Sequence, residues 1–308
     1  MEMFFFLVIE LVYNKCYNKV EGDNMEYNIS KDVNIIRILL DLSQEELANI
    51  IGVEKISISR LETGKSDLSE RKIKELYNFI YSKKIYLNKL KSAMYKEMLN
   101  NNEILLFHGS KTMIKGSISL NYSKSNNDFG RGFYCGETYE QALNFVSDFN
   151  NSSIYLFKFN KTDLKSRTYF LNREWLMLVA YFRGVLKNFN NYSILQELLS
   201  EIKELDYIVA PIADNRMFEI IDLFIDGIIT DEQCVHCLAS SNLGQQIVIL
   251  SDKAISRLDF LERFFISDNE RKEVVISKQK DKKINHDKVK LAMIEYKNQG
   301  KYIEEIVK

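Results

Sequence analysis

The sequence is poor in the residues that build flexible linkers and disulfide frameworks. Its 308 residues include one proline, Pro211, and 12 glycines, which form no glycine-rich run. Because proline- and glycine-rich segments are the usual flexible spacers, we expect the domains to be joined by helical or Asn/Lys-rich connectors. The four cysteines are too sparse for a disulfide framework and favour a reduced, cytoplasmic protein.

Strong net charge and long apolar runs are also lacking. The formal net charge of −1 excludes a general attraction to nucleic acid or membrane surfaces, so any basic surface must be local. The apolar run from Met3 to Ile9 is too short to span a bilayer and has no basic leader, which predicts neither a membrane helix nor a signal peptide. Met25 is an alternative translation start, because ordered-looking sequence begins just after it.

Metal-ligand side chains cluster once, in Cys234-Val-His236-Cys237. This cluster lacks a second pair of ligands at zinc-finger spacing. We therefore predict that the side chains pack in the interior and that the protein holds no metal, with metal binding as the less favoured alternative.

The composition suits a globular protein of two domains, with 46% hydrophobic and 28% charged residues. In the first third of the chain, Ser43 and Glu46 form a capping box that starts a helix ending at Gly52. Apolar residues at helical spacing predict three further helices, over residues 33–40, 55–61 and 69–80. This region therefore predicts a small, all-helical domain.

Several motifs in that region resemble the helix-turn-helix of Cro and the phage repressors: Ser43-Gln-Glu-Glu-Leu-Ala, Ile58-Ser-Arg60-Leu-Glu62 and Thr63-Gly64-Lys65. The resemblance implies a DNA-binding domain whose contacts with DNA come from six residues: Gln44, Glu54, Lys55, Ser57, Arg60 and Lys65. Basic residues outnumber acidic ones only slightly here, so operator binding would require a homodimer. The alternative is that this helical domain docks a protein partner.

Farther along the chain, two strand-like segments carry residues suited to a binding site. The apolar stretch 104–107 predicts a buried strand that brings His108, Gly109 and Ser110 to its open end. Gly132, which permits close backbone approach, leads into a second strand that carries Tyr134. We predict that the two strand ends face one pocket.

These segments resemble the His-Gly-Ser/Thr and Gly-x-Gly-x-Tyr motifs of the poly-ADP-ribose-polymerase and diphtheria-toxin-like ADP-ribosyltransferases. With Asp206-Tyr-Ile-Val-Ala-Pro211 and Gly244-Gln-Gln-Ile-Val-Ile, they are similar to an uncharacterised bacterial family placed in that superfamily. The resemblance implies an α+β fold, in which a small all-α helix-turn-helix domain precedes a split antiparallel sheet with helices. The cleft of that sheet would bind NAD as substrate.

The resemblance also implies roles for individual residues in binding NAD. His108 would hold the ribose beside the nicotinamide, and Tyr134 would stack on the nicotinamide ring. Gly109 would offer its backbone to the carboxamide, because a residue without a side chain lets the amide approach. Ser110 and Gly132 complete this part of the cofactor-binding set.

Two further residues follow the third motif. Arg216 would bind the NAD pyrophosphate, since its guanidinium suits phosphate geometry. Asp214 would bind a ribose hydroxyl or the acceptor. The alternative is a surface turn in which these two charges pair with each other.

Gln245 occupies the position at which the related enzymes carry a catalytic Glu. A carboxamide can orient a ribose hydroxyl, but it is neutral and stabilises a developing cation less well than a carboxylate does. Either Asp214 or Glu137 supplies the missing carboxylate, or the site has kept binding and lost transfer.

The sequence predicts five segments: an N-terminal extension (1–28), a helix-turn-helix domain (29–82), a helical linker (83–102), a transferase-like domain (103–266) and a basic helical tail (267–308). The predicted function is transfer of ADP-ribose from NAD to an unknown macromolecular acceptor with release of nicotinamide, as in a toxin-like or phage-defence effector. An antitoxin protein is a candidate partner. One alternative is a DNA-binding regulator that only binds NAD or a related nucleotide, and another is a protein-interaction adaptor.

Overall fold

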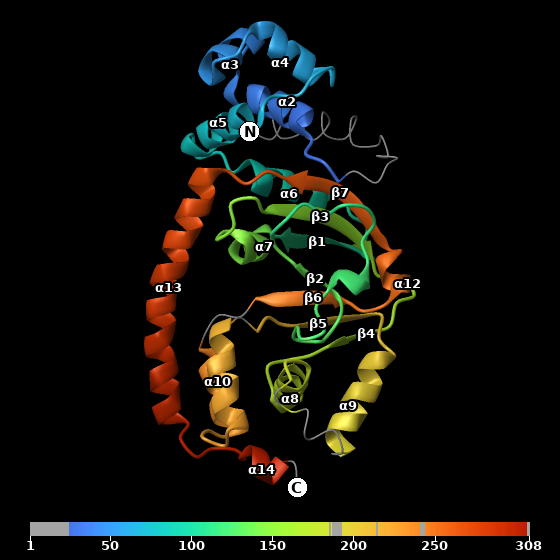
Figure 1. Ribbon diagram of the computed structural model, residues 1–308, viewed down its shortest axis with the longest axis vertical. Helices are drawn as coiled ribbons and strands as arrows, with labels where there is room; N and C mark the ends of the chain where they lie inside the picture. Colours follow the sequence, from blue (N-terminus) through green and yellow to red (C-terminus); the bar gives the residue numbers. More distant parts are fainter. Residues whose placement is uncertain (1–24, 185, 187–192, 214, 241–243, 307–308) are drawn as a thin grey trace.

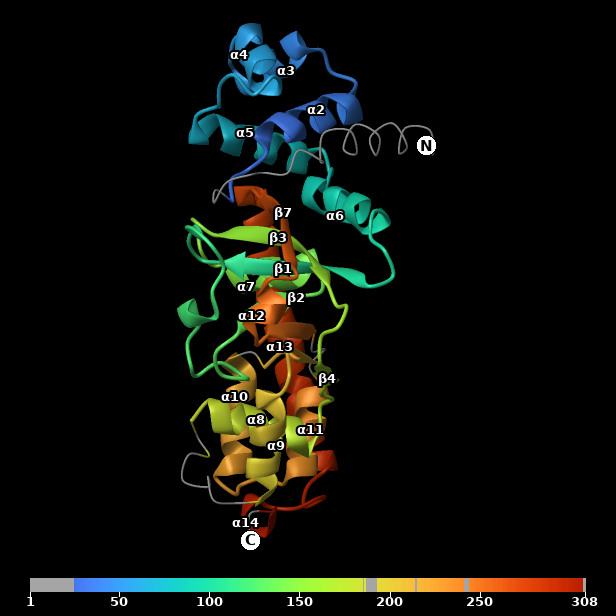
Figure 2. The same cartoon turned by 90° about the vertical axis from the view of Figure 1, so that its right-hand side faces the viewer.

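The computed structural model describes residues 25–184, 186, 193–213, 215–240 and 244–306. A bundle of short helices lies at one end of an elongated molecule, and a seven-stranded sheet fills its middle (Figures 1 and 2). The expected α+β order, helical domain first and sheet second, is therefore confirmed. Most of the predicted N-terminal extension lies outside the described residues. Each helix in the described parts of the chain is too short or too polar to cross a membrane.

The helical bundle forms where the capping signals predict it. Its four helices are α2 (Ile29–Leu40), α3 (Gln44–Ile51), α4 (Lys55–Glu62) and α5 (Glu70–Ser82). The capping box is present: Ser43 Oγ accepts a hydrogen bond from the Glu46 N–H at 3.1 Å, and a Glu46 carboxylate oxygen accepts one from the Ser43 N–H at 2.7 Å. Gly52 ends α3 with a φ of 66°, a conformation that costs glycine little.

The sheet runs in the order β4-β5-β6-β2-β1-β3-β7. Its strands are β1 (Glu103–Ser110), β2 (Phe133–Gly136), β3 (Ser153–Asn160), β4 (Ser166–Thr168), β5 (Tyr207–Pro211), β6 (Gln245–Ile249) and β7 (Leu258–Phe264). All neighbouring pairs are antiparallel except β4 and β5, which are parallel. The sheet is thus mixed, whereas the resemblance implied an antiparallel sheet.

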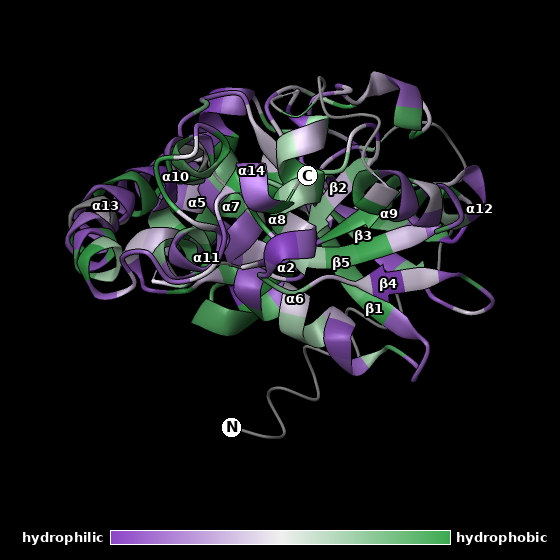
Figure 3. Cartoon of the chain, turned by 90° about the horizontal axis from the view of Figure 1, so that it is seen from below, coloured by the Kyte–Doolittle hydropathy of each residue, from purple (hydrophilic) through white to green (hydrophobic). Residues whose placement is uncertain are grey.

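Helices cover the sheet unevenly along its length. They are η1 (Leu120–Tyr122), α7 (Tyr139–Val146), α8 (Arg173–Phe182), α9 (Ser193–Lys203), α10 (Asn215–Ile225), α11 (Asp231–Ala239) and α12 (Asp252–Ile255). α7 packs on β1 and β3, whereas the core around α8 and α10 includes residues of β5 and β6. Seen along the long axis, β3 and β5 show mostly hydrophobic residues between their covering helices (Figure 3).

The C-terminal residues form a long strap rather than a separate tail. Helix α13 (Asp268–Glu295) runs along the side of the molecule from α5 to the opposite end, where α14 (Ile303–Ile306) follows (Figure 1). Glu273 accepts a hydrogen bond from Tyr81 of α5 at 2.8 Å, and Lys278 pairs with Asp148 beyond α7 at 2.5 Å. The strap therefore contacts both the helical bundle and the sheet domain.

A buried charge cluster joins the two domains. Lys91 of α6 (Leu87–Glu97) lies 2.6 Å from a carboxylate oxygen of Asp32 in α2 and 2.6 Å from one of Glu262 in β7. Tyr77 donates to Asp32, and Tyr95 donates to Glu262 at 2.9 Å. Burial alone would lower the pKa of Lys91, but the two carboxylates reverse this effect and raise it. The predicted linker helix is thus part of a buried interface.

We predict that Lys91→Met destabilises the chain by roughly 3–5 kcal/mol, because it leaves buried Asp32 without its cation and leaves Glu262 with only Lys31, 3.8 Å away. Urea unfolding at pH 7 measures this change. Lys89→Met is the matched control on the same helix, since Lys89 pairs with Glu140 at a half-exposed position. Equal losses in the two variants would contradict the assignment of the buried cluster as the contact that joins the domains.

Candidate functional site

The site is organised by a break in the sheet between β1 and β2. These strands share a single register pair, Phe107 with Gly136, whereas β1 pairs with β3 along its whole length. Beyond Phe107, the edge of β1 that carries His108 to Ser110 has no strand pairing with β2. A sheet that opens in this way leaves polar backbone and side-chain groups directed into a gap between strands.

His108 spans this gap. Its Nδ1 lies 2.8 Å from the carbonyl oxygen of Tyr134, and its ring stacks on Phe133 at a centroid distance of 4.3 Å. A carbonyl only accepts hydrogen bonds, so Nδ1 carries the proton and Nε2 is the unprotonated nitrogen of the neutral ring. Burial lowers the pKa of His108, which favours this neutral form. Nε2 accepts no hydrogen bond from the described residues.

The hydroxyl of Tyr134 is occupied by hydrogen bonds within the chain, which leaves only its ring available to a ligand. The phenol oxygen accepts a hydrogen bond from the Phe129 N–H at 3.0 Å and donates one to the Gly130 carbonyl at 2.8 Å. Burial raises the pKa of Tyr134 well above its ordinary value, so the phenol remains neutral. Because both bonds fix the ring, Tyr134 can offer a held aromatic surface for stacking.

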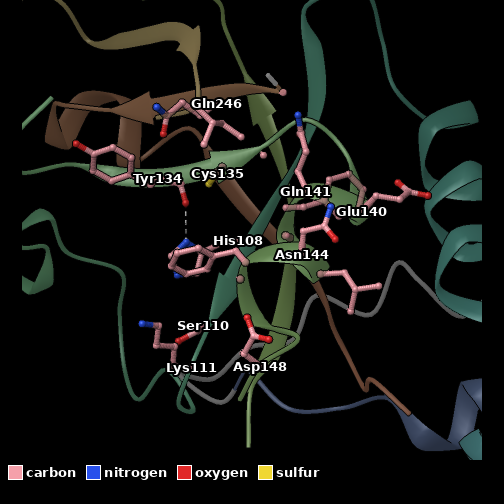
Figure 4. Close-up of a pocket in the computed structure, with 18 of the residues that line it drawn as sticks. His108, Ser110, Lys111, Tyr134, Cys135, Glu140, Gln141, Asn144, Asp148 and Gln246 are labelled. Atoms are coloured by element: carbon pink, nitrogen blue, oxygen red, sulfur yellow. Dashed lines mark hydrogen bonds between the residues drawn. The ribbon is translucent and has the colours of Figure 1, made fainter. Parts of the chain in front are cut away.

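Alternation along the strands places the two rings on opposite faces of the sheet. His108 lies two residues after Leu106 in β1, so its side chain is on the face of the sheet where Leu106 packs with Phe133 and Cys135. Tyr134 is on the other face, where it packs against the cluster that contains Val248. Both residues nevertheless line one cavity. Figure 4 shows the imidazole directed at the backbone of Tyr134.

The cavity is a groove of about 2030 Å³ that extends from the break toward α13. Ser110 lies in its wall and donates to the Thr112 carbonyl at 2.7 Å. Asp214 lies outside the described residues, as does the side chain of Arg216, although the backbone of Arg216 belongs to α10. Their predicted roles therefore stay predictions.

Gln246, and not Gln245, is the glutamine in the wall of the cavity. Gln245 is exposed at the start of β6, while Gln246 is 6% exposed and lies on the same face as Val248 and Tyr134. The sequence match fell on Gln245, but strand alternation sends neighbouring side chains to opposite faces, and of the two only Gln246 lines the cavity. The catalytic role predicted for Gln245 stays a prediction. Glu137 is likewise exposed and does not line the cavity.

Gly109 and Gly132 are explained by packing. A Cβ on Gly109 would lie 2.8 Å from the Ala142 carbonyl oxygen of α7, and one on Gly132 would lie 2.7 Å from the Val248 side chain. Both distances are too short for any side chain, so glycine is required for α7 and β6 to pack closely. Both glycines also line the cavity, and their predicted contact with NAD stays a prediction.

Cys234, His236 and Cys237 lie on α11 and are used in packing. Both thiols are buried, and burial raises the pKa of Cys237 to about 11, so it stays protonated rather than becoming a thiolate ligand. His236 stacks on Tyr296 at a centroid distance of 3.6 Å. Among the described residues, no group of three ligand-type side chains is arranged to hold a metal ion.

A second candidate surface lies on the helical bundle. Ile58 and Leu61 of α4 are buried, so the opposite side of this helix presents Lys55 and Arg60 to solvent. The remaining predicted DNA contacts surround it: Glu54 and Lys65 are exposed, and Gln44 and Ser57 are partly exposed. Gln44 donates to Glu62 at 2.6 Å, which fixes its side chain beside α4.

Residues 104–260, about half of the 308 residues, match the family described as "Protein of unknown function (DUF3990)". The chain belongs to this family. Residues 34–79 match the family described as "Helix-turn-helix", which suggests that the helical bundle binds DNA. Comparisons with curated proteins and with solved structures find no match.

Glu270, which lines the far end of the groove, predicts a pH-dependent stability. Burial raises its pKa from 4.5 to about 7, although Tyr139 donates to it at 3.1 Å. The folded chain then binds more protons than the unfolded chain between these values, so stability falls as pH rises from about 4.5 through 7. We expect Glu270→Gln to remove this fall and to be more stable at pH 8 by up to about 3 kcal/mol.

Urea unfolding at pH 5 and pH 8 measures the effect. Exposed Glu197→Gln serves as the control and should keep the wild-type pH dependence. An unchanged pH dependence in Glu270→Gln would contradict a buried, hard-to-ionise carboxyl group.

For the helical bundle, we expect Arg60→Ala and Lys65→Ala each to weaken binding to duplex DNA and to lower the salt slope by about 1. Fluorescence anisotropy across a salt series measures both quantities. Lys203→Ala, at the end of α9 in the sheet domain, should leave the slope unchanged. Salt slopes that match the wild type in both test variants would argue against α4 as the DNA-contacting helix.

Proposed function

We propose that the sheet domain binds NAD at the break between β1 and β2 and transfers its ADP-ribose to a macromolecular acceptor. The observation that carries the proposal is the set of groups facing one cavity: an unprotonated imidazole nitrogen of His108, the held ring of Tyr134 and the carboxamide of Gln246. Hydroxyl groups of a ribose suit the two acceptors, and a nicotinamide ring suits the aromatic surface.

In this reaction, the bond between the ribose C1′ and the nicotinamide nitrogen breaks, and its electron pair leaves with neutral nicotinamide. A nucleophile of the acceptor then forms a bond to C1′ and releases its proton. His108 and Gln246 would hold ribose hydroxyls while positive charge develops on the sugar. Because both groups are fixed by bonds within the chain, they need little reorganisation to do so.

The helix-turn-helix domain makes DNA the second partner. A chain that joins the two activities fits a toxin-like or defence effector that controls its own transcription. We propose that it binds its operator as a homodimer, since one bundle with a small basic excess makes few phosphate contacts. An antitoxin protein remains the corresponding partner in this proposal.

The neutral side chain of Gln246 favours a second candidate function. A carboxamide lacks the charge that would stabilise a sugar cation, so the domain would bind NAD or a related nucleotide without transfer. The helix-turn-helix domain would then report nucleotide binding as a change in operator affinity. The two candidates differ in whether nicotinamide is released.

We expect NAD labelled in its adenylate part to modify a component of cell protein, DNA or RNA, with release of nicotinamide. His108→Ala should lower this rate roughly 100-fold, because one misplaced binding group costs about that much. His236→Ala, a histidine that stacks on Tyr296 far from the break, is the matched control. Tyr134→Phe should keep more activity than Tyr134→Ala, since it keeps the ring.

Saturable NAD binding without nicotinamide release from any acceptor would favour the regulator. Absence of NAD binding would contradict both candidates. Equal losses in His108→Ala and His236→Ala would mean that the break is not the site.

A further inference from the structure

A buried carboxylate lies directly behind the glutamine of the cavity. Asp128 is 4% exposed, and its Oδ1 accepts hydrogen bonds from Arg183 at 3.1 and 2.6 Å. Its Oδ2 accepts one from the Ala213 N–H at 3.2 Å and one from Gln246 Nε2 at 2.8 Å. Asp128, which precedes β2, thus joins Gln246 of β6 to Arg183 and to the chain after β5.

The partners of Gln246 determine the orientation of its carboxamide. Nε2 donates both to Asp128 and to the carbonyl oxygen of Pro211, at 2.8 and 3.0 Å. Both partners can only accept, so the nitrogen must face them, and the assignment of nitrogen and oxygen is fixed by chemistry. Both N–H groups are then used, and Oε1 is turned away from the two acceptors.

In the described part of the chain, Gln246 Oε1 is consequently an acceptor without a donor. No described residue donates to it, and it is not among the fully enclosed unpaired atoms. Gln246 as a whole is 6% exposed, and its accessible surface belongs to the wall of the cavity. Figure 4 shows its carboxamide beside Tyr134, with His108 on the other side of β2. A buried polar atom of this kind is satisfied only by a ligand donor or by water.

We propose that Asp128 is a positioning residue that holds the Gln246 carboxamide with its oxygen toward the ligand, so that Gln246 accepts a hydrogen bond from a ribose hydroxyl. This inference rests on the proposed binding of NAD. Held in this way, Gln246 directs a hydrogen-bond-accepting oxygen at the ligand, as a glutamate at the same position would. The negative charge is on Asp128, behind Gln246, and is paired with Arg183.

Calorimetric titration tests the proposal by comparing the affinity of each variant for NAD with its affinity for an NAD analogue that lacks the 2′-hydroxyl of the nicotinamide ribose. The wild type should prefer NAD roughly tenfold, the effect of one hydrogen bond. Gln246→Leu removes the acceptor and should abolish the preference. Asp128→Ala removes the group that fixes the carboxamide and should also abolish it.

Asp128→Asn separates positioning from a purely structural role. Its remaining oxygen can still accept from Gln246, while Arg183, with 27% of its side chain exposed, can turn to solvent. This variant should therefore keep most of the preference for NAD. Arg131→Ala, an exposed residue on the same loop, is the control and should bind both ligands as the wild type does.

An unchanged preference in Asp128→Ala, with both ligands weakened equally, would overturn the proposal and leave the proposed function intact. If Asp128→Ala does not fold, a preference that persists in Gln246→Leu overturns it instead. Failure of the wild type to bind NAD would remove the proposed function itself, and this inference with it.

Discussion

The hydrogen bond between the His108 imidazole and the Tyr134 carbonyl replaces a strand pairing at the centre of the sheet. A continuous ladder between β1 and β2 would satisfy its own backbone groups and close the sheet. The bond from a side chain holds the two strands together while leaving space between them, and it also fixes which imidazole nitrogen meets the cavity. The same contact therefore keeps the sheet open and leaves Nε2 of His108 as a hydrogen-bond acceptor.

The break is held by packing on both sides. On the β1 side, α7 requires Gly109, and on the β2 side, β6 requires Gly132. The turn before β2 is fixed by the phenol of Tyr134 and by Asp128, which also reaches Gln246. Because these contacts share residues, a change at one of them is expected to alter the others, and their energetic effects will not add.

The helical bundle is attached to the far edge of the same sheet, and not by a flexible connector. Lys91 lies between carboxylates of α2 and β7, and the strap α13 contacts α5 as well as the chain after α7. With Lys31 beside Glu262, four charges are buried here, and burial of charges is costly unless each is paired, so this interface specifies one docking geometry. If the proposed nucleotide binds at the break, such a rigid attachment gives it a physical route to α4 through β1, β3 and β7.

Local signals in the sequence predicted the helices of the bundle and strands β1 and β2 well. The capping box at Ser43 and the glycine at position 52 depend only on neighbouring residues, so the first helices begin and end near the expected positions. β7 escaped prediction because buried Glu262 and Arg263 interrupt its apolar pattern. Helix α11 was not predicted as a helix either, although its cysteines were expected to pack in the interior, as they do.

The site was predicted only in part, because its geometry depends on register. His108 and Tyr134 could be placed near one pocket from their motifs, but the choice between Gln245 and Gln246 requires the pairing of β6 with β2. The available signal for Gln246 was its position two residues before the apolar Val248, which places both side chains on the same face of β6. Neither the partnership of Asp128 with Gln246 nor the role of Lys91 could be read from the sequence, since each joins segments far apart in the chain.

The most direct test of the account is a crystal structure of the chain with a non-hydrolysable NAD analogue. We expect the nicotinamide ring on Tyr134 and ribose hydroxyls about 3 Å from His108 Nε2 and Gln246 Oε1. An analogue bound elsewhere, with both acceptors facing only water, would contradict it.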